Sequence, residues 1–189
     1  MARTIPSAAI VGLLAALLLA AGPATADEPM DPFLGTYVGT AEVYDSDGRV
    51  VERRHMDIVI TEGQRGAYEI DWINVTLVDD RRDLPGVRRR VDHLTLTPGD
   101  QEGLYLEESR RSLFERRRSA DPMEGDALRW ARLDGGRLGV FSLVILDDGA
   151  YSLQSYERIL TEHGMDIEFQ RIQDGEVTRR ITGRTIRVE

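Results

Sequence analysis

Residues 165–172 read MDIEFQRI, and this stretch decides the fold class. Its apolar side chains, Met165, Ile167 and Phe169, alternate with polar ones at every second position. A period of two places alternate side chains on opposite faces of an extended chain, so the pattern predicts a β-strand with one buried face. Arg171 continues the buried parity and is expected to end the strand on the inner side.

The same kind of segment recurs along the chain from residue 33 onward, divided by turns that contain glycine. Glycine-containing turns at close spacing are typical of β-hairpins. No segment after residue 26 shows a convincing helical period. The predicted strands cover residues 33–44, 50–61, 67–78, 87–97, 103–109, 127–133, 137–146, 151–160, 165–172 and 177–188.

About ten consecutive hairpin strands without a linker predict one all-β domain over residues 27–189, a single antiparallel up-and-down β-barrel. Closing the sheet removes the exposed edge strands that invite aggregation. An open half-barrel and a two-sheet β-sandwich fit the same pattern and remain alternatives.

Alternation also predicts which side chains face the interior. The predicted inner set is Tyr37, Met56, Ile58, Ile60, Tyr68, Ile70, Trp72, Leu128, Trp130, Met165, Ile167 and Phe169. Its aromatic members and the inward arginine form the candidate ligand-binding residues: Tyr37, Trp72, Trp130, Phe169 and Arg171. Two roles are open for Arg171, structural closure by stacking on an aromatic ring and binding of a ligand carboxylate. A small barrel filled by its own side chains would leave no pocket.

The strand at residues 137–146 is apolar on both faces. A barrel strand normally presents its outer face to water, so a second covering layer is expected here. Phe141, Leu143 and Ile145 are the candidate interface residues on this strand. The cover is expected to be a partner subunit, as in a homodimer, or the irregular stretch 110–126.

The first 26 residues predict export. Arg3 is followed by an unbroken apolar run over residues 8–21, and Ala24-Thr25-Ala26 is the small-x-small pattern of a signal-peptidase site. A run of about fourteen residues is short for a membrane span. We expect residues 1–26 to be a signal peptide and the product to be periplasmic or secreted.

Composition excludes several function classes. The chain has 33 acidic residues against 24 cationic ones, a net charge of −9, which argues against binding nucleic acid or anionic lipid. All cationic side chains are arginine, so Schiff-base chemistry and a pyridoxal cofactor have no lysine to use. There is no cysteine, hence no disulfide and no lipid-anchoring residue, and no membrane anchor is expected.

No motif predicts catalysis or metal binding. His55, His93 and His163 lack the spacing of a metal site, and no cysteine is available as a ligand. The sequence has no nucleophile elbow, phosphate-binding loop or zinc-protease helix. We therefore predict no catalytic residue, no metal and no cofactor, and whether the chain is an enzyme is left open.

The segment Phe33-Leu34-Gly35-Thr36-Tyr37-Val38-Gly39 resembles the first strand of the calycin barrels, which include the lipocalins, fatty-acid-binding proteins and nitrobindin-like domains. Those barrels begin with a Phe-x-Gly-x-Trp-like strand, and Tyr37 stands where Trp is usual. In lipocalins an arginine from a late strand covers the Trp, so the resemblance implies that Arg171 or Arg184 covers Tyr37.

Three hypotheses for function follow. The first is an exported, non-catalytic binding module whose barrel interior holds a small apolar or amphipathic ligand. The second is a structural or interaction protein of the cell envelope that acts through a homodimer or partner surface around Phe141. The third, and the most distant, is a calycin-type enzyme.

Overall fold

A computed structural model describes residues 30–108 and 120–188. These residues form ten antiparallel strands, and each strand pairs with its neighbours in sequence. The last strand pairs with the first, so the sheet closes into a barrel. The strands are β1 (Gly35–Tyr44), β2 (Val50–Glu62), β3 (Tyr68–Thr76), β4 (Arg88–Pro98), β5 (Leu104–Glu107), β6 (Leu128–Asp134), β7 (Arg137–Ile145), β8 (Tyr151–Leu160), β9 (Gly164–Gln173) and β10 (Glu176–Val188).

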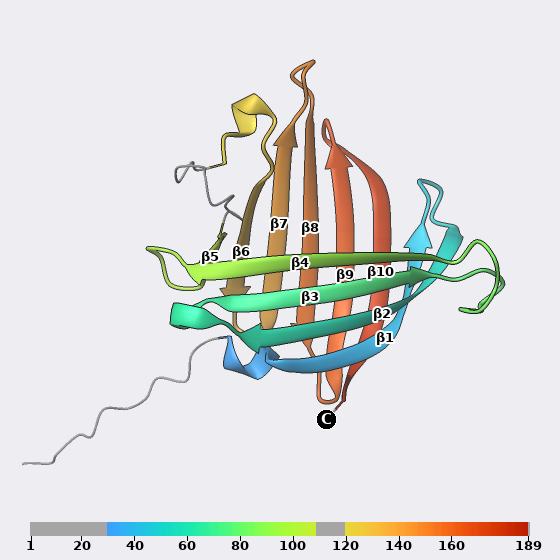
Figure 1. Cartoon of the computed structure of the whole chain (residues 1–189). Helices are drawn as coiled ribbons and strands as arrows, with labels where there is room; N and C mark the ends of the chain where they lie inside the picture. Colours follow the sequence, from blue (N-terminus) through green and yellow to red (C-terminus); the bar gives the residue numbers. More distant parts are fainter. Residues whose placement is uncertain (1–29, 109–119, 189) are drawn as a thin grey trace, which may run out of the picture.

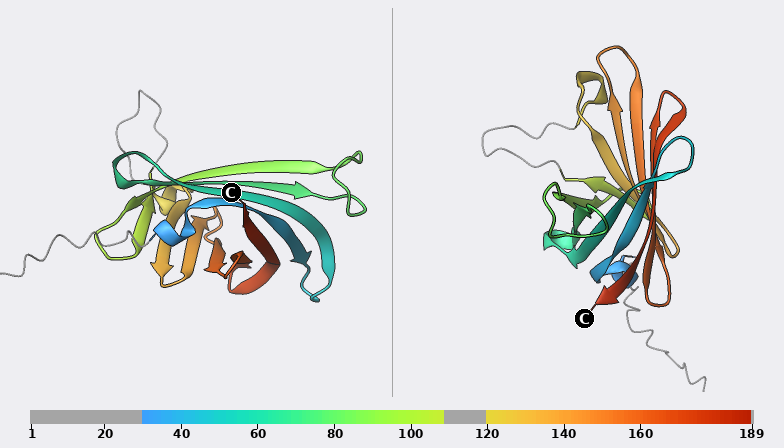
Figure 2. Two further views of the ribbon diagram at one scale, coloured as in Figure 1. Left: turned by 90° about the horizontal axis from the view of Figure 1, so that it is seen from below. Right: turned by 90° about the vertical axis from the view of Figure 1, so that its right-hand side faces the viewer.

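The structure confirms the predicted single up-and-down barrel and excludes the half-barrel and the sandwich. Strands β1 to β4 cross in front of β6 to β10 at a steep angle (Figure 1), and the two further views show the same two crossed faces (Figure 2). Three short 3₁₀ helices complete the fold: η1 (Asp31–Phe33), η2 (Gln64–Gly66) and η3 (Pro122–Glu124). None of the helices in the described ranges is long and apolar enough to cross a membrane.

Two glycines permit the strands to approach closely where β10 crosses its neighbours. A Cβ atom on Gly39 would lie 2.0 Å from the carbonyl oxygen of Arg184. A Cβ atom on Gly164 would lie 2.0 Å from the carbonyl oxygen of Thr185. Any side chain at either position would displace the β10 backbone, so both positions require glycine.

One end of the barrel is closed by the segment before β1. Met30 and Phe33 are fully buried there and pack into the core. The Tyr37 hydroxyl donates a hydrogen bond of 2.9 Å to the Phe33 carbonyl oxygen, which fastens η1 to the barrel wall. The Arg187 guanidinium lies 5.2 Å from the centre of the Tyr37 ring and donates hydrogen bonds to the Tyr37 hydroxyl and the Pro32 carbonyl oxygen.

The arginine that covers Tyr37 is therefore Arg187, and the prediction of Arg171 or Arg184 is wrong. Arg187 is the direct cross-strand neighbour of Tyr37 between β10 and β1. Arg184 has the opposite parity and forms an ion pair with Asp166 on the outer face. Arg171 lies near the far end of β9, beside Arg179 of β10.

The predicted signal peptide lies outside the described residues, as does most of the stretch 110–126. Within the described chain, most of the predicted inner set is buried in one core. Leu128 and Trp130 are exceptions, and their position is described with the site.

Candidate functional site

The barrel interior is apolar toward the closed end and polar toward the other end. Along β2 the inward-facing residues run from Ile60 to Arg54 and then Glu52. Along β9 the inward parity runs from Phe169, which is buried, to Arg171. Side chains alternate regularly along both strands. The change from an apolar to a charged lining therefore comes from the residue types and not from a change in which side chains face inward.

A cavity of about 290 Å³ opens at this polar end. Six arginines and a single carboxylate are among the described residues around it. Its lining comprises Glu52, Arg54, Asn74, Thr76, Arg88, Arg89, Arg90, Tyr156, Phe169, Arg171, Arg179 and Ile181. An acidic chain of net charge −9 thus surrounds its recess with positive charge.

Three of these arginines are held by carboxylates. Glu52 accepts hydrogen bonds from Arg54 and, at 3.1 Å, from Arg88. Asp92 forms an ion pair of 2.8 Å with Arg90. The hydrogen bond from Arg90 to Asp92 raises the pKa of Arg90 above its ordinary value. These pairs fix one side of the cavity.

The opposite side has arginines without such partners. Arg171 and Arg179 are cross-strand neighbours on β9 and β10. Arg171 Nε is buried and has no hydrogen-bond partner within the described part of the chain. A guanidinium presents a planar fork of donors that fits carboxylate or phosphate oxygens. This side is therefore the part of the interior best suited to an anionic group.

Deeper in the barrel, an aromatic cluster bounds a second cavity of about 30 Å³. Tyr156 of β8 lies 4.4 Å from Phe169 and 6.0 Å from Trp72, measured between ring centres. Both cavities are lined by Tyr156 and Phe169, so the aromatic cluster separates the inner space from the outer one. Burial raises the pKa of the Tyr156 hydroxyl, which keeps the phenol neutral.

Arg158 also borders the inner cavity and is only 3% exposed. Its guanidinium lies 5.6 Å from the Trp72 ring centre and 6.0 Å from that of Tyr156, which are cation–π distances. Burial lowers the pKa of Arg158 to about 10, so the side chain keeps its charge at neutral pH.

Of the predicted ligand-binding residues, Trp72, Phe169 and Arg171 border the two cavities. Tyr37 borders neither, because it is packed and hydrogen-bonded at the closed end. Arg54, Arg158 and Arg179 were not predicted. Arg158 shares the parity of Tyr156 and Leu160, but the opposite parity of β8 is also apolar, so alternation gave no clear signal for it.

Trp130 lies on the outer face, so the prediction that it and Leu128 face the interior is wrong. Its neighbour Ala131 is fully buried and occupies the inward parity of β6. The Trp130 ring stacks on Phe141 of β7 at 5.3 Å between ring centres, with an interplanar angle of 19°. Trp130 therefore belongs with the candidate interface residues rather than with the ligand site.

Phe141, Leu143 and Ile145 lie on that same outer face of β7 and are partly buried. Leu143 is paired with Leu128 of β6 and with Leu153 of β8. The 3₁₀ helix η3, from the predicted covering stretch, contacts β7, and residues 109–119 fall outside the described residues.

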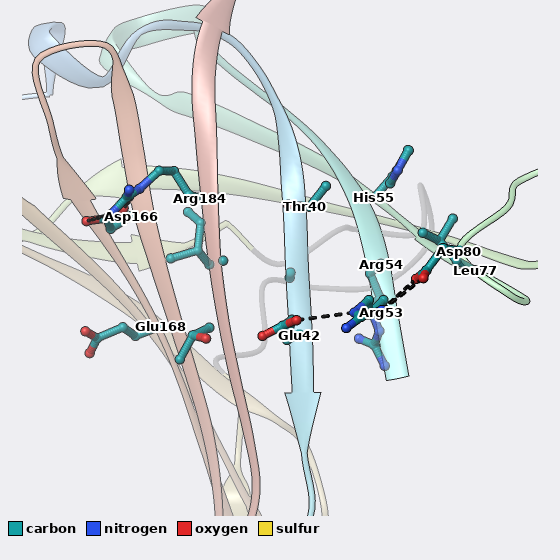
Figure 3. Close-up of a pocket in the computed structure, with 14 residues that line it drawn as sticks. Thr40, Glu42, Arg53, Arg54, His55, Leu77, Asp80, Asp166, Glu168 and Arg184 are labelled. Carbon is teal, nitrogen blue, oxygen red and sulfur yellow. Dashed lines mark hydrogen bonds and ion pairs between the residues drawn. The ribbon is translucent and has the colours of Figure 1, made fainter. Parts of the chain in front are cut away.

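A larger groove of about 690 Å³ lies on the outside of β1, β2, β9 and β10 (Figure 3). Five of its charged side chains pair with one another. Arg53 pairs with Glu42 at 3.3 Å and with Asp80 at 2.9 Å, and Arg184 pairs with Asp166 at 2.7 Å. Such exposed pairs indicate an ordinary charged surface. Within residues 30–108 and 120–188 there is no group of three or more histidines or carboxylates suited to a metal ion.

The comparisons with known proteins concern the fold. No protein-family model matches the chain, and no curated protein is similar to it in sequence. A crystal structure of a protein with unknown function from the DUF3598 family of Nostoc punctiforme superposes with a TM-score of 0.53 at 15% sequence identity. The match covers 84% of this chain and 49% of that one, so this chain spans about half the length of its structural neighbour.

Proposed function

We propose that this protein is an exported, non-catalytic binding module for a small amphipathic anion. The ligand's anionic group contacts Arg171 and Arg179 at the open end of the barrel, and its apolar body lies against Tyr156 and Phe169. The observation that carries this proposal is the recessed cavity with six arginines and one carboxylate in its wall.

Electrostatics supports an anion over a neutral ligand. Cations gathered in one recess repel each other, and an acidic chain has carboxylates to spare for pairing them. Glu52 and Asp92 pair with three of the cavity arginines, but Arg171 Nε has no acceptor within the described residues. An anion at Arg171 would supply the missing acceptor for its buried Nε.

The architecture supports a small ligand. Closed β-barrels of about eight strands have interiors that are either filled by side chains or hold one small molecule. A cavity of about 290 Å³ is at the lower end of the ~300–1,000 Å³ usual for small-molecule pockets. We infer that the barrel is calycin-like, since η1 closes one end and Arg187 covers Tyr37 as the resemblance implies.

Export is part of the proposal and rests on the sequence. The apolar run at residues 8–21 and the Ala24-Thr25-Ala26 site support secretion to a periplasm or the medium. A binding module in that compartment acts as a carrier or sensor of small solutes.

The test uses two fluorescent probes that share an aromatic body. Anilinonaphthalene sulfonate carries an anionic group, and N-phenylnaphthylamine lacks it. We expect one-to-one binding of the sulfonate, with the neutral probe bound at least about tenfold more weakly, because a hydrogen bond to a charged group contributes ~1.5–3 kcal/mol. Equal affinity for the two probes would count against an anion site.

Variants locate the binding. Arg171→Ala removes a cavity arginine and is expected to weaken sulfonate binding about tenfold or more. Arg184→Ala removes an arginine from the outer face, where it pairs with Asp166, and should leave binding unchanged. Equal effects of the two substitutions would show that the probe responds to total charge, and would refute the proposed site.

A second candidate function is supported by the outward Trp130–Phe141 stack. Two adjacent aromatic rings and Leu143 on an outer barrel face are typical of a surface that contacts a partner. On this alternative the protein acts in the envelope through a homodimer or a partner surface.

A further inference from the structure

The buried Arg158 guanidinium lacks hydrogen-bond partners that its position calls for. Its Nε and Nη1 atoms are both buried, and neither has an acceptor within the described residues. The Trp72 and Tyr156 rings attract the charge but accept no conventional hydrogen bond from these two atoms. Buried polar groups in native proteins are nearly always paired, so an unpaired pair of donors requires an explanation.

Arg187 provides an internal comparison. It also lies over an aromatic ring, that of Tyr37, and there its donors are satisfied by the Tyr37 hydroxyl and the Pro32 carbonyl oxygen. Arg187 thus closes its end of the barrel with protein acceptors. Arg158 has the same stacking without the acceptors, which distinguishes it from a structural closure.

The space beside Arg158 suits one small polar group. The inner cavity has about 30 Å³ and lies next to the outer cavity, with Tyr156 and Phe169 lining both. Arg54 and Asn74 also line both cavities. A volume above ~10–15 Å³ admits a single water-sized group. A carboxylate oxygen reaching in from the outer cavity would meet the unpaired donors.

We propose that Arg158 forms an inner anion subsite, so that the ligand is a compact dicarboxylate with one acidic group at Arg158 and the other at Arg171 and Arg179. This inference rests on the proposed function and narrows its ligand class. The short apolar body between the two acidic groups lies against Tyr156 and Phe169. A ligand with one acidic group would leave one of the two arginine subsites empty.

The probes are linear dicarboxylates from succinate to suberate, each compared with the monocarboxylate of equal chain length by titration calorimetry. We expect at least one dicarboxylate to bind about tenfold or more tightly than its monocarboxylate, because a second charge-assisted contact forms. A ratio near one at every length would overturn the inner subsite. Failure of every carboxylate and of the fluorescent sulfonate would overturn the proposed function as well.

The variant Arg158→Met tests whether Arg158 is responsible for the preference for dicarboxylates over monocarboxylates. We expect the variant to bind dicarboxylates and monocarboxylates equally, while its melting temperature without ligand rises, because an unpaired buried charge is replaced by an apolar chain. Arg171→Ala should weaken both ligand classes instead.

A retained dicarboxylate preference in Arg158→Met would overturn the proposal, whatever the melting temperature. If Arg158→Met has a lowered melting temperature and has lost the preference, Arg158→Lys is measured next. This variant keeps a charge but not the guanidinium fork. The inner subsite is supported if Arg158→Lys folds normally and recovers part of the preference, because an ammonium group still pairs with a carboxylate. It is overturned if Arg158→Lys folds normally and the preference is absent as in Arg158→Met. If a water molecule satisfies Arg158 and the residue has no ligand role, the dicarboxylate preference does not depend on residue 158 and is retained in Arg158→Met.

Discussion

Replacing Tyr37 with Phe should destabilise the closed end of the barrel. The Tyr37 hydroxyl donates to the Phe33 carbonyl oxygen at 2.9 Å and accepts from Arg187 Nη2 at 2.6 Å. The first bond is between neutral groups and contributes ~0.5–1.5 kcal/mol, and the second involves a charge and contributes ~1.5–3 kcal/mol. We expect Tyr37→Phe to lower the free energy of unfolding by about 2–4 kcal/mol. For a domain of this size that corresponds to a melting temperature lower by roughly 5–15 °C.

Urea unfolding followed by circular dichroism measures this loss, and Tyr151→Phe is the matched control because Tyr151 is 37% exposed. The control should stay within about 0.5 kcal/mol of the wild type. Combining Tyr37→Phe with Arg187→Met in a double-mutant cycle should give a coupling energy of about 1–3 kcal/mol. A Tyr37→Phe effect no larger than that of the control would refute the role of the Tyr37 hydroxyl in stabilising the closed end. Strictly additive effects of Tyr37→Phe and Arg187→Met would refute the contact between these two side chains.

Two further predictions concern Tyr156 and Phe141. Because burial raises the pKa of Tyr156, the folded protein keeps this proton above pH ~10, where the unfolded chain has released it, so stability falls as pH rises in that range. Tyr156→Phe should reduce that fall by up to about 1.4 kcal/mol per pH unit in unfolding experiments, and identical slopes for the two proteins would contradict the burial of the phenol. If the outer face of β7 joins two copies, Phe141→Glu should lower the sedimentation coefficient while sulfonate binding at Arg171 persists; an unchanged coefficient argues against the interface.

The fold followed from the sequence because its signals are local. Each hairpin turn contains glycine, and each strand lies between two such turns, so strand positions could be read without knowing any long-range contact. Once consecutive strands pair, the question that remains is whether the first and last strands also pair and close the sheet into a barrel. The contact of β1 with β10 settles that choice through pairs such as Tyr37 with Arg187, which no local pattern contains.

The position of Trp130 could not be read locally. Strand β6 has apolar residues on both parities, and size favoured the tryptophan over Ala131 as the inward residue. The structure reverses this, because Ala131 faces the interior opposite Tyr105 of β5 and Val140 of β7. A small residue fits where large side chains from neighbouring strands already fill the barrel.

The late arginines show a similar limit. In β10 the inward parity is carried by Ile181, Gly183 and Thr185, of which only the first is apolar. Alternation is therefore too weak there to identify Arg187 as inward and Arg184 as outward. Arg158 could not be identified as inward either, because β8 has apolar residues on both parities and an arginine is expected at the surface unless a partner is visible.

The two arginines that stack on aromatic rings suggest how the barrel divides stability from binding. At the closed end, Arg187 has protein acceptors, and removing one is expected to lower stability. At the inner cavity, the Nε and Nη1 of Arg158 have none, and removing the charge is expected to raise stability. Natural sequences retain a destabilising group where function requires it. Opposite signs for the two substitutions would show that Arg187 stabilises the closed end and that Arg158 is retained at a cost in stability, while the dicarboxylate titrations decide whether Arg158 binds the ligand.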